Sequence, residues 1–189
     1  FEASKAGTVP PLESVRDDVW SLALSMPGGH IPYSLQYLLR DSDGAMHVID
    51  PGWDSDDNWR TLIDALATVG AVVQDVRSIT ATHLHPDHIG MAARLQAASG
   101  GRMQLHVIER EALGGFQAER RSAWTAGEAL SEWGVPRERL EEIERVAKNS
   151  PQPSTIRIDR VLADGERLDI PGFDLVAMLT AGHTSGHLS

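Results

Sequence analysis

The chain has 189 residues, of which 41% are hydrophobic and 23% charged, as is typical of a globular domain with one sizeable core. It contains no cysteine, which excludes disulfides, a thiol nucleophile and thiolate metal ligands and fits a reducing, cytoplasmic compartment. The formal net charge of -10 disfavours a nucleic acid partner, because a phosphate backbone is bound through lysine and arginine. No apolar run approaches the ~20 residues that cross a membrane, so we expect no membrane association.

Predicted strands and helices alternate through the first part of the chain. Strands are predicted at residues 19–24, 33–39, 45–49, 76–82 and 103–108. Asp41 begins and Gly44 ends a predicted turn that makes a hairpin of the second and third strands. Apolar residues at helical spacing over 59–69 predict a helix that Ser55 or Asp56 caps. A second helix is predicted over residues 89–99, so the repeated units indicate an α/β layered domain.

A helical insert is predicted at about residues 109–150, where the pattern changes. Trp124 and Trp133 lie on one predicted helix, and a second helix follows Pro136. Two interpretations remain open. Phe116, Trp124 or Trp133 would contribute to a substrate lid, or the tryptophans fill the core of a helical pair. A β-rich portion follows the insert.

The six residues His83-Leu84-His85-Pro86-Asp87-His88 are the most informative segment of the chain. Imidazole and carboxylate are ligand types that zinc and similar divalent metals prefer. In an extended segment the side chains at i and i+2 point the same way, so His83 and His85 can bind one metal together. Pro86 turns the chain, and Asp87 and His88 can then face a second metal.

This hexapeptide resembles the H-x-H-x-D-H signature of the metallo-β-lactamase superfamily. Residues 48–52 resemble the early strand of that family that ends in an Asp-containing turn, with Asp50 in the turn. Residues 180–187 resemble the later T-x-G-H-T-x-G-H segment, whose first histidine, His183 here, is a metal ligand. The resemblance extends over residues 15–189.

The resemblance implies a four-layer αββα sandwich formed by a single domain over residues 1–189, with its second half incomplete. Family members continue past the later histidine segment and supply an Asp and a His for the second metal. We therefore expect the functional protein to extend beyond Ser189.

The resemblance also implies a ligand set. His83, His85 and His183 would form the first metal site, and Asp87 and His88 would begin the second. Three neutral imidazoles leave one tetrahedral position open for water. Zinc is the expected metal, as one or two ions, with iron or manganese as alternatives. Asp50 either orients the ligands or caps its turn.

The implied activity is hydrolysis of a small-molecule ester, thioester, lactone or amide, with a thioester slightly preferred. Hydroxide formed on the metal would attack the carbonyl, and Asp87 would be catalytic. The alternative is a non-hydrolytic metal-binding or redox module on the same scaffold. The complete set of first-half ligands favours the enzyme. No motif identifies the substrate or the oligomeric state.

The remaining histidines are expected to have other roles. His187 is expected to orient the later histidine loop, and His30 to be a solvated loop residue. His47 and His106 are expected to be ordinary residues of a sheet.

Overall fold

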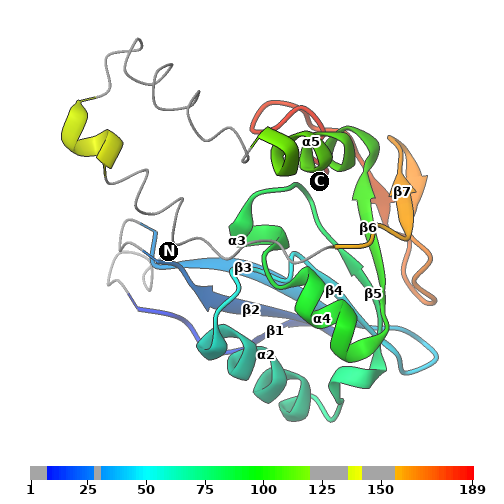
Figure 1. The fold of residues 1–189 in the computed structure, drawn as a ribbon. Coiled ribbons are helices and arrows are strands. Elements are labelled where there is room, and N and C mark those ends of the chain that lie inside the picture. The colour runs from blue at the N-terminus through cyan, green and yellow to red at the C-terminus, as the bar shows by residue number, and fades with distance from the viewer. Residues whose placement is uncertain (1–7, 28–30, 120–135, 142–155) are drawn as a thin grey trace.

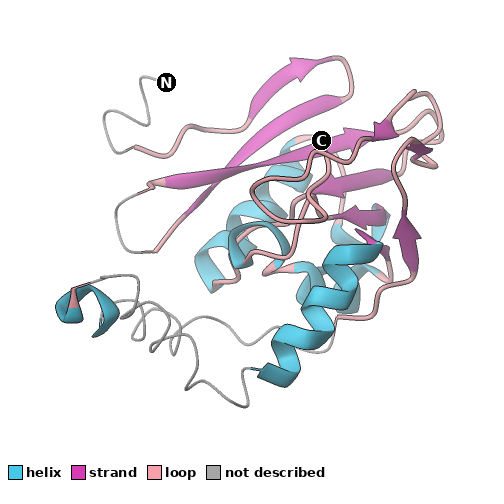
Figure 2. Ribbon diagram, turned by 90° about the horizontal axis from the view of Figure 1, so that it is seen from above, coloured by secondary structure: helices cyan, strands magenta, loops and turns pink. Residues whose placement is uncertain are grey.

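The structure is a computed structural model that describes residues 8–27, 31–119, 136–141 and 156–189. Its main feature is a seven-stranded sheet with helices packed over one face (Figures 1 and 2). The strands of this sheet are β1 (Glu13–Arg16), β2 (Val19–Ser25), β3 (Tyr33–Arg40), β4 (Met46–Ile49), β5 (Val76–Thr80), β6 (Arg102–His106) and β7 (Arg160–Leu162). The helices are α2 (Asp56–Thr68), α3 (Pro86–Ile89), α4 (Ala92–Ser99) and α5 (Val107–Glu119), with the 3-10 helix η1 (Val73–Asp75). A two-stranded antiparallel sheet pairs β8 (Glu166–Arg167) with β9 (Val176–Ala177).

The seven-stranded sheet changes from antiparallel to parallel pairing across its width. Its strands lie in the order β1-β2-β3-β4-β5-β6-β7. The pairs from β1 to β4 are antiparallel, and the pairs from β4 to β7 are parallel. Parallel neighbours need a crossover connection, and α2 and α4 supply the first two. The carboxyl ends of β4, β5 and β6 therefore meet at one edge, where Asp50, His83 and Glu109 follow.

One apolar core fills the space between this sheet and helices α2 and α4. Leu38, Val48 and Ile79 face it from three central strands, and Leu62 and Leu95 face it from the two helices. All five side chains are completely buried. Burial of a side chain of this size stabilises the fold by roughly 1.5–3 kcal/mol. The core thus holds the carboxyl edge of the sheet on a rigid base.

The predicted hairpin and the predicted helix cap are both present. The carboxylate of Asp41 accepts hydrogen bonds from the backbone N–H of Asp43 at 3.0 Å and of Ala45 at 2.8 Å, which closes the β3–β4 turn. Of the two predicted caps of α2, the structure selects Ser55. Its Oγ accepts a hydrogen bond from the backbone N–H of Asn58 at 3.1 Å.

The prediction of one continuous helix over residues 89–99 is wrong. The structure has two helices, α3 and α4, with Gly90 and Met91 between them. The backbone N–H of Met91 bonds to the carbonyl oxygen of Gly52 at 2.9 Å, so the chain leaves the helical ladder at this point. Helix α3 begins at Pro86, whose fixed φ suits a first helical position. The second half of the hexapeptide is therefore helical.

The predicted strand over residues 103–108 is too long. It ends at His106, and α5 begins at Val107. The backbone N–H of Ile108 bonds to Nδ1 of His106 at 3.3 Å, a contact over two residues that turns the chain out of the sheet.

The helical insert predicted at about 109–150 is described only in part. Helix α5 extends to Glu119, and a helical turn covers residues 137–141. Trp124, Trp133 and His30 lie outside the described residues, and so does the choice between a lid and a core role. The insert and the single-domain organisation stay predictions. In the described ranges, no helix has the length and apolar character that a membrane span requires.

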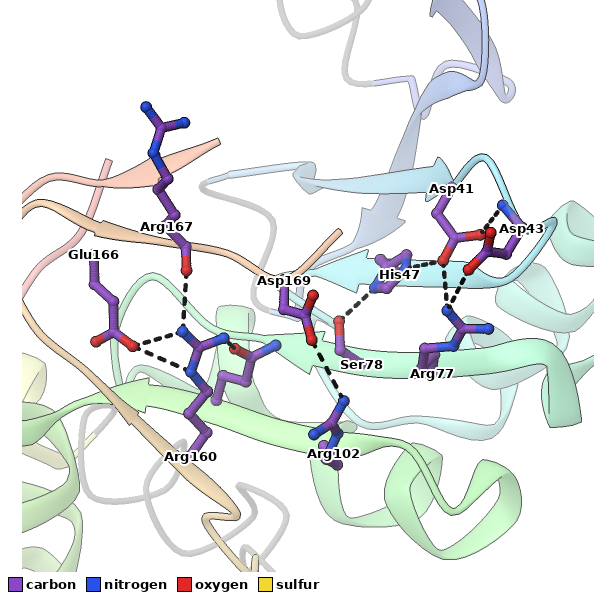
Figure 3. A network of polar contacts seen from close by, with 11 residues as sticks. Asp41, Asp43, His47, Arg77, Ser78, Arg102, Arg160, Glu166, Arg167 and Asp169 are labelled. Atoms are coloured by element: carbon purple, nitrogen blue, oxygen red, sulfur yellow. Dashed lines mark hydrogen bonds and ion pairs between the residues drawn. The ribbon is translucent and has the colours of Figure 1, made fainter. Parts of the chain in front are cut away.

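A buried polar network lies on the face of the sheet opposite the helices (Figure 3). The His47 ring bonds to Oγ of Ser78 through Nδ1 at 2.7 Å and to Oδ2 of Asp41 through Nε2 at 3.0 Å. The order Ser78–His47–Asp41 resembles that of a serine catalytic triad. However, the exposed fractions of His47, Ser78 and Asp41 are only 1%, 4% and 4%, and Arg77 also binds Asp41. The network therefore fastens the β3–β4 turn to β5.

A second layer begins on this same face. Arg160 in β7 donates to Oε1 of Glu166 at 2.6 Å and to the carbonyl oxygen of Arg167 at 3.0 Å, which attaches β8 to the sheet (Figure 3). A small apolar cluster lies beside these contacts and consists of Leu162, Ala177 and Leu188, with Leu168 packed against it.

Candidate metal centre

Three histidine rings converge at the carboxyl edge of the sheet. Nε2 of His83 lies 3.2 Å from Nδ1 of His85, and the same Nδ1 lies 3.0 Å from Nε2 of His183. One ring nitrogen from each histidine lies within 4.8 Å of the other two, so the three could hold one metal ion. A neutral imidazole has one donor and one acceptor nitrogen. Three nitrogens that face one point cannot all satisfy one another, whereas a cation satisfies all three.

The tautomer of His83 follows from its neighbours. The Thr82 hydroxyl lies 2.9 Å from Oδ2 of Asp50, which can only accept, so the hydroxyl donates there. The hydroxyl must then accept from Nδ1 of His83, also at 2.9 Å. The backbone N–H of Thr82 also donates to Asp50, at 2.7 Å. This chain of hydrogen bonds leaves the lone pair of His83 on Nε2, the atom that faces the other rings.

Asp87 and His88 stand beside the three-histidine group, on the short helix α3. The His88 ring centroid lies 4.1 Å from that of His83. Nδ1 of His88 lies 2.9 Å from Oδ2 of Asp50, and its Nε2 lies 3.3 Å from Oδ2 of Asp87. The structure thus gathers all five predicted ligand residues in one place. Their assignment as metal ligands stays a prediction.

The pKa shifts of the three-histidine group and of the Asp87–His88 pair differ. Burial and the neighbouring imidazoles lower the pKa of His83 to about 4. Burial and then His183 lower the pKa of His85. Both rings therefore carry a free lone pair at neutral pH, as metal ligands must.

The Asp87–His88 pair holds a proton instead. Burial opposes the charged form of His88, but hydrogen bonds with Asp50 and Asp87 outweigh it and raise its pKa to about 9. Burial would raise the pKa of Asp87, but the hydrogen bond with His88 outweighs it and lowers that pKa. Without metal, His88 is therefore an imidazolium between two carboxylates.

The turn after β4 holds the hexapeptide in position. The backbone N–H of Gly52 donates to the carbonyl oxygen of His88 at 2.9 Å. Gln36 donates through Nε2 to the carbonyl oxygen of Pro51 at 2.8 Å, and the Ser34 hydroxyl donates to that of Asp87 at 3.0 Å. Gly52 has a φ of 86°, which favours glycine. Both sides of the turn are therefore tied, one to β3 and one to α3.

The later histidine segment closes the site from the other side. The backbone N–H of Leu188 donates to the carbonyl oxygen of Thr82 at 3.0 Å, next to His83. Nδ1 of His187 lies 3.1 Å from Oγ1 of Thr180 within the same loop. The His187 ring lies 5.0 Å from that of His83, but its nitrogens are not among the converging three.

The three converging histidines differ in their exposure to solvent. His83 is buried, His85 is half-buried and His183 is exposed. Within the described residues, the converging nitrogens are therefore least covered at His183.

Two residues of the site carry no motif signal in the sequence. Thr82 orients His83, and Glu109 contacts both ligand-bearing loops from the first turn of α5. The only sequence signal for either is a polar residue placed two or three positions after a buried strand. For Asp50, contacts to Thr82 and His88 favour the orienting role over the turn cap.

The family model described as the Metallo-beta-lactamase superfamily matches residues 32–189. A metallo-beta-lactamase family protein from Thermus thermophilus is similar at 25% sequence identity and a TM-score of 0.74, covering 93% of this chain and 56% of that chain. The comparison with curated proteins gave no match.

Two further solved structures are similar at lower identity. For the FEZ-1 metallo-beta-lactamase from Legionella gormanii, the identity is 17% and the TM-score 0.67, with 95% of this chain and 56% of that chain covered. For BJP-1, a subclass B3 metallo-beta-lactamase of Bradyrhizobium japonicum, the values are 19%, 0.66, 98% and 58%. These likenesses confirm the predicted fold class. The chain spans little more than half of each structure, in line with an incomplete second half of the sandwich.

Proposed function

We propose that this chain, which belongs to the metallo-beta-lactamase superfamily by the match over residues 32–189, is the metal-binding part of a metal-dependent hydrolase. The convergence of three histidine nitrogens within 4.8 Å carries the proposal. Family membership supports metal-dependent hydrolysis in general. The likeness to solved structures supports the fold. Because this chain covers little more than half of each of those structures, we propose the activity of the whole protein from the site.

We assign the first metal site to His83, His85 and His183, with zinc as the expected ion. The donor set fits, because neutral imidazole is a common zinc ligand and two of the three rings have lowered pKa values. Asp87 and His88 would take part in a second site. When bound, the ion supplies Lewis acidity and lowers the pKa of a coordinated water to ~7.

The residues of the chain do the remaining work. Asp50, directly and through Thr82, directs Nε2 of both His83 and His88 away from itself. Asp87 lies beside Nε2 of His88 and holds its carboxylate where a proton can be accepted.

The proposed reaction is hydrolysis of a carbonyl bond in a small ester, thioester, lactone or amide, with a thioester slightly preferred. We also propose that the protein is cytoplasmic and has no nucleic acid partner.

Initial rates on a panel of thioester, lactone, ester and β-lactam substrates test the function. The zinc-loaded protein should hydrolyse at least one class, lose the activity to a chelator and regain it with zinc. Asp87→Ala should lower the rate by about 100- to 10,000-fold, as expected for loss of a proton-transfer group. Asp57→Ala is the matched control, because that side chain is 86% exposed and pairs only with Arg60 in the described residues. A zinc-loaded protein that hydrolyses none of the classes would favour the non-hydrolytic alternative.

A further inference from the structure

Glu109 is a buried acid that no part of the proposed reaction uses. It lies in the first turn of α5, three residues after the end of β6, and its exposed fraction is 1%. Placing a carboxylate out of water is costly unless hydrogen bonds satisfy its oxygens. No ion pair to Glu109 is found in the described part of the chain, so uncharged donors must supply these hydrogen bonds.

Each carboxylate oxygen of Glu109 accepts one backbone N–H, and the two come from distant loops. Oε2 accepts from Leu84 at 2.9 Å, and Oε1 accepts from Gly186 at 2.8 Å. Leu84 lies between His83 and His85. Gly186 lies between His183 and His187. One side chain therefore joins the loop with two of the converging histidines to the loop with the third.

The close approach at Gly186 depends on the absence of a side chain. A Cβ at this position would lie 2.8 Å from Oε1 and 2.9 Å from Cγ of Glu109, and 2.9 Å from Nδ1 of His106. Real Cβ atoms do not come this close to other heavy atoms. The backbone of the later histidine loop can therefore reach the carboxylate only because residue 186 is glycine.

We propose that Glu109 is a positioning residue of the metal site, whose carboxylate sets the distance between the His83–His85 loop and the His183 loop. The inference rests on the metal site of the proposed function. Glu109 touches none of the converging nitrogens and acts through the backbone of Leu84 and Gly186. Loss of one oxygen acceptor should release one loop and misplace at least one histidine donor.

Hydrogen exchange of the metal-free wild-type protein tests the contact itself. The amide protons of Leu84 and Gly186 should exchange slowly, because both are held by a buried charged acceptor. In Glu109→Gln the amide group offers one acceptor and one donor, so at least one of the two protons should lose its protection. Fast exchange of either proton in the wild type overturns the contact, whatever the variants do.

Metal release tests the positioning role. Glu109→Gln should release zinc to a chelator about 10- to 100-fold faster than the wild type, the usual cost of losing a residue that supports metal ligands. Its cobalt-substituted form should show a changed visible absorption spectrum, because the ligand geometry changes. Glu111→Gln is the matched control on the same helix, with a side chain 68% exposed, and should match the wild type in both measurements.

The outcomes separate the inference from the proposed function. Lost amide protection with unchanged zinc release and an unchanged cobalt spectrum would overturn the positioning role and leave the metal site standing. A wild type that binds no zinc would overturn the metal site. If Glu109→Gln does not fold, Glu109→Asp replaces it, because it keeps both oxygens but retracts them by one methylene. Zinc release from Glu109→Asp at the wild-type rate would also overturn the role.

Discussion

At the scale of single residues, Asp50 is the centre of the hydrogen bonds behind the metal site. It accepts from the backbone and the hydroxyl of Thr82 and from His88, and it has a φ of 56°, uncommon for a residue other than glycine. A strained residue held by three hydrogen bonds at a site is consistent with an orienting role.

Replacing Asp50 by Asn tests that role. The substitution removes the negative charge beside Nδ1 of His88, so the pKa of His88 should fall from about 9 towards its ordinary value. A pH titration of the His88 ring by NMR in the metal-free variant measures the change. Asp57→Asn, on the exposed face of α2, is the control and should leave His88 unchanged. An unchanged His88 pKa in Asp50→Asn would show that Asp50 does not hold its proton.

The pKa shifts of His83 and His88 predict how the stability of the metal-free protein depends on pH. The folded pKa of His88, about 9, lies above the ordinary 6.5, so its contribution is present below pH 6.5 and is lost as pH rises through about 9. The folded pKa of His83, about 4, lies below 6.5, so its contribution is present above pH 6.5 and is lost as pH falls through about 4.

The free energy of unfolding from urea titrations should therefore have its maximum near pH 6.5 for these two groups. His88→Ala should remove the decline on the alkaline side and keep the decline on the acid side. An alkaline decline of the same size in His88→Ala and the wild type would contradict the assignment.

The residue types at the site could be predicted because they are concentrated in two short segments. The hexapeptide and the later histidine segment hold all five predicted ligands. Thr82 and Glu109 could not be predicted in this way. Glu109 meets its partners across 25 and 77 positions of sequence. The parallel pairing of β5 and β6 brings Leu84 and Glu109 to the same end of the sheet, and the segment after β9 brings Gly186 there.

At the scale of elements, Gly52 in the turn after β4 allows the cost of steric crowding to be separated from the cost of a positive φ. Gly52 and Gly44 have nearly equal φ values, 86° and 87°. A Cβ at Gly52 would lie 2.8 Å from Cδ1 of Leu24 and would also collide with the Gln36 side chain, whereas a Cβ at Gly44 would meet nothing within 4 Å.

Gly52→Ala should lower the free energy of unfolding by about 2–4 kcal/mol, because strain and overpacking add. Gly44→Ala should lower it by only about 1–2 kcal/mol, the cost of the left-handed backbone alone. Urea unfolding of both variants measures the difference. Equal losses would mean that the turn is free to move away from β3, contrary to the contacts of Gln36 and Gly52.

Elements were predictable where periodicity is long and were misjudged where a single hydrogen bond diverts the chain. The hairpin and α2 follow from a turn signal and a regular apolar face. The division of residues 89–99 into two helices depends on Met91 bonding to Gly52, 39 positions earlier, and no pattern within the segment encodes it. The end of β6 depends on the His106 ring turning the chain.

At the scale of the whole molecule, the site joins two parts of the fold. His83, His85 and the residues of α3 stand on the carboxyl edge of the main sheet. His183 comes from the segment after β9, which adds to the second layer. The α/β sandwich could be predicted because the motifs lie in the order typical of the family, whereas the pairing of seven strands in one sheet needed the structure.

The zinc content of the purified protein, measured by elemental analysis after equilibration with zinc, tests the central claim most directly. The wild type should hold at least one zinc ion per chain, and His85→Ala should lose most of it, because Nδ1 of His85 lies between the two other donors. His187→Ala, which removes a neighbouring ring outside the converging set, should keep the wild-type content. A wild type without zinc, or a His85→Ala variant that holds as much zinc as the wild type, would contradict the three-histidine site.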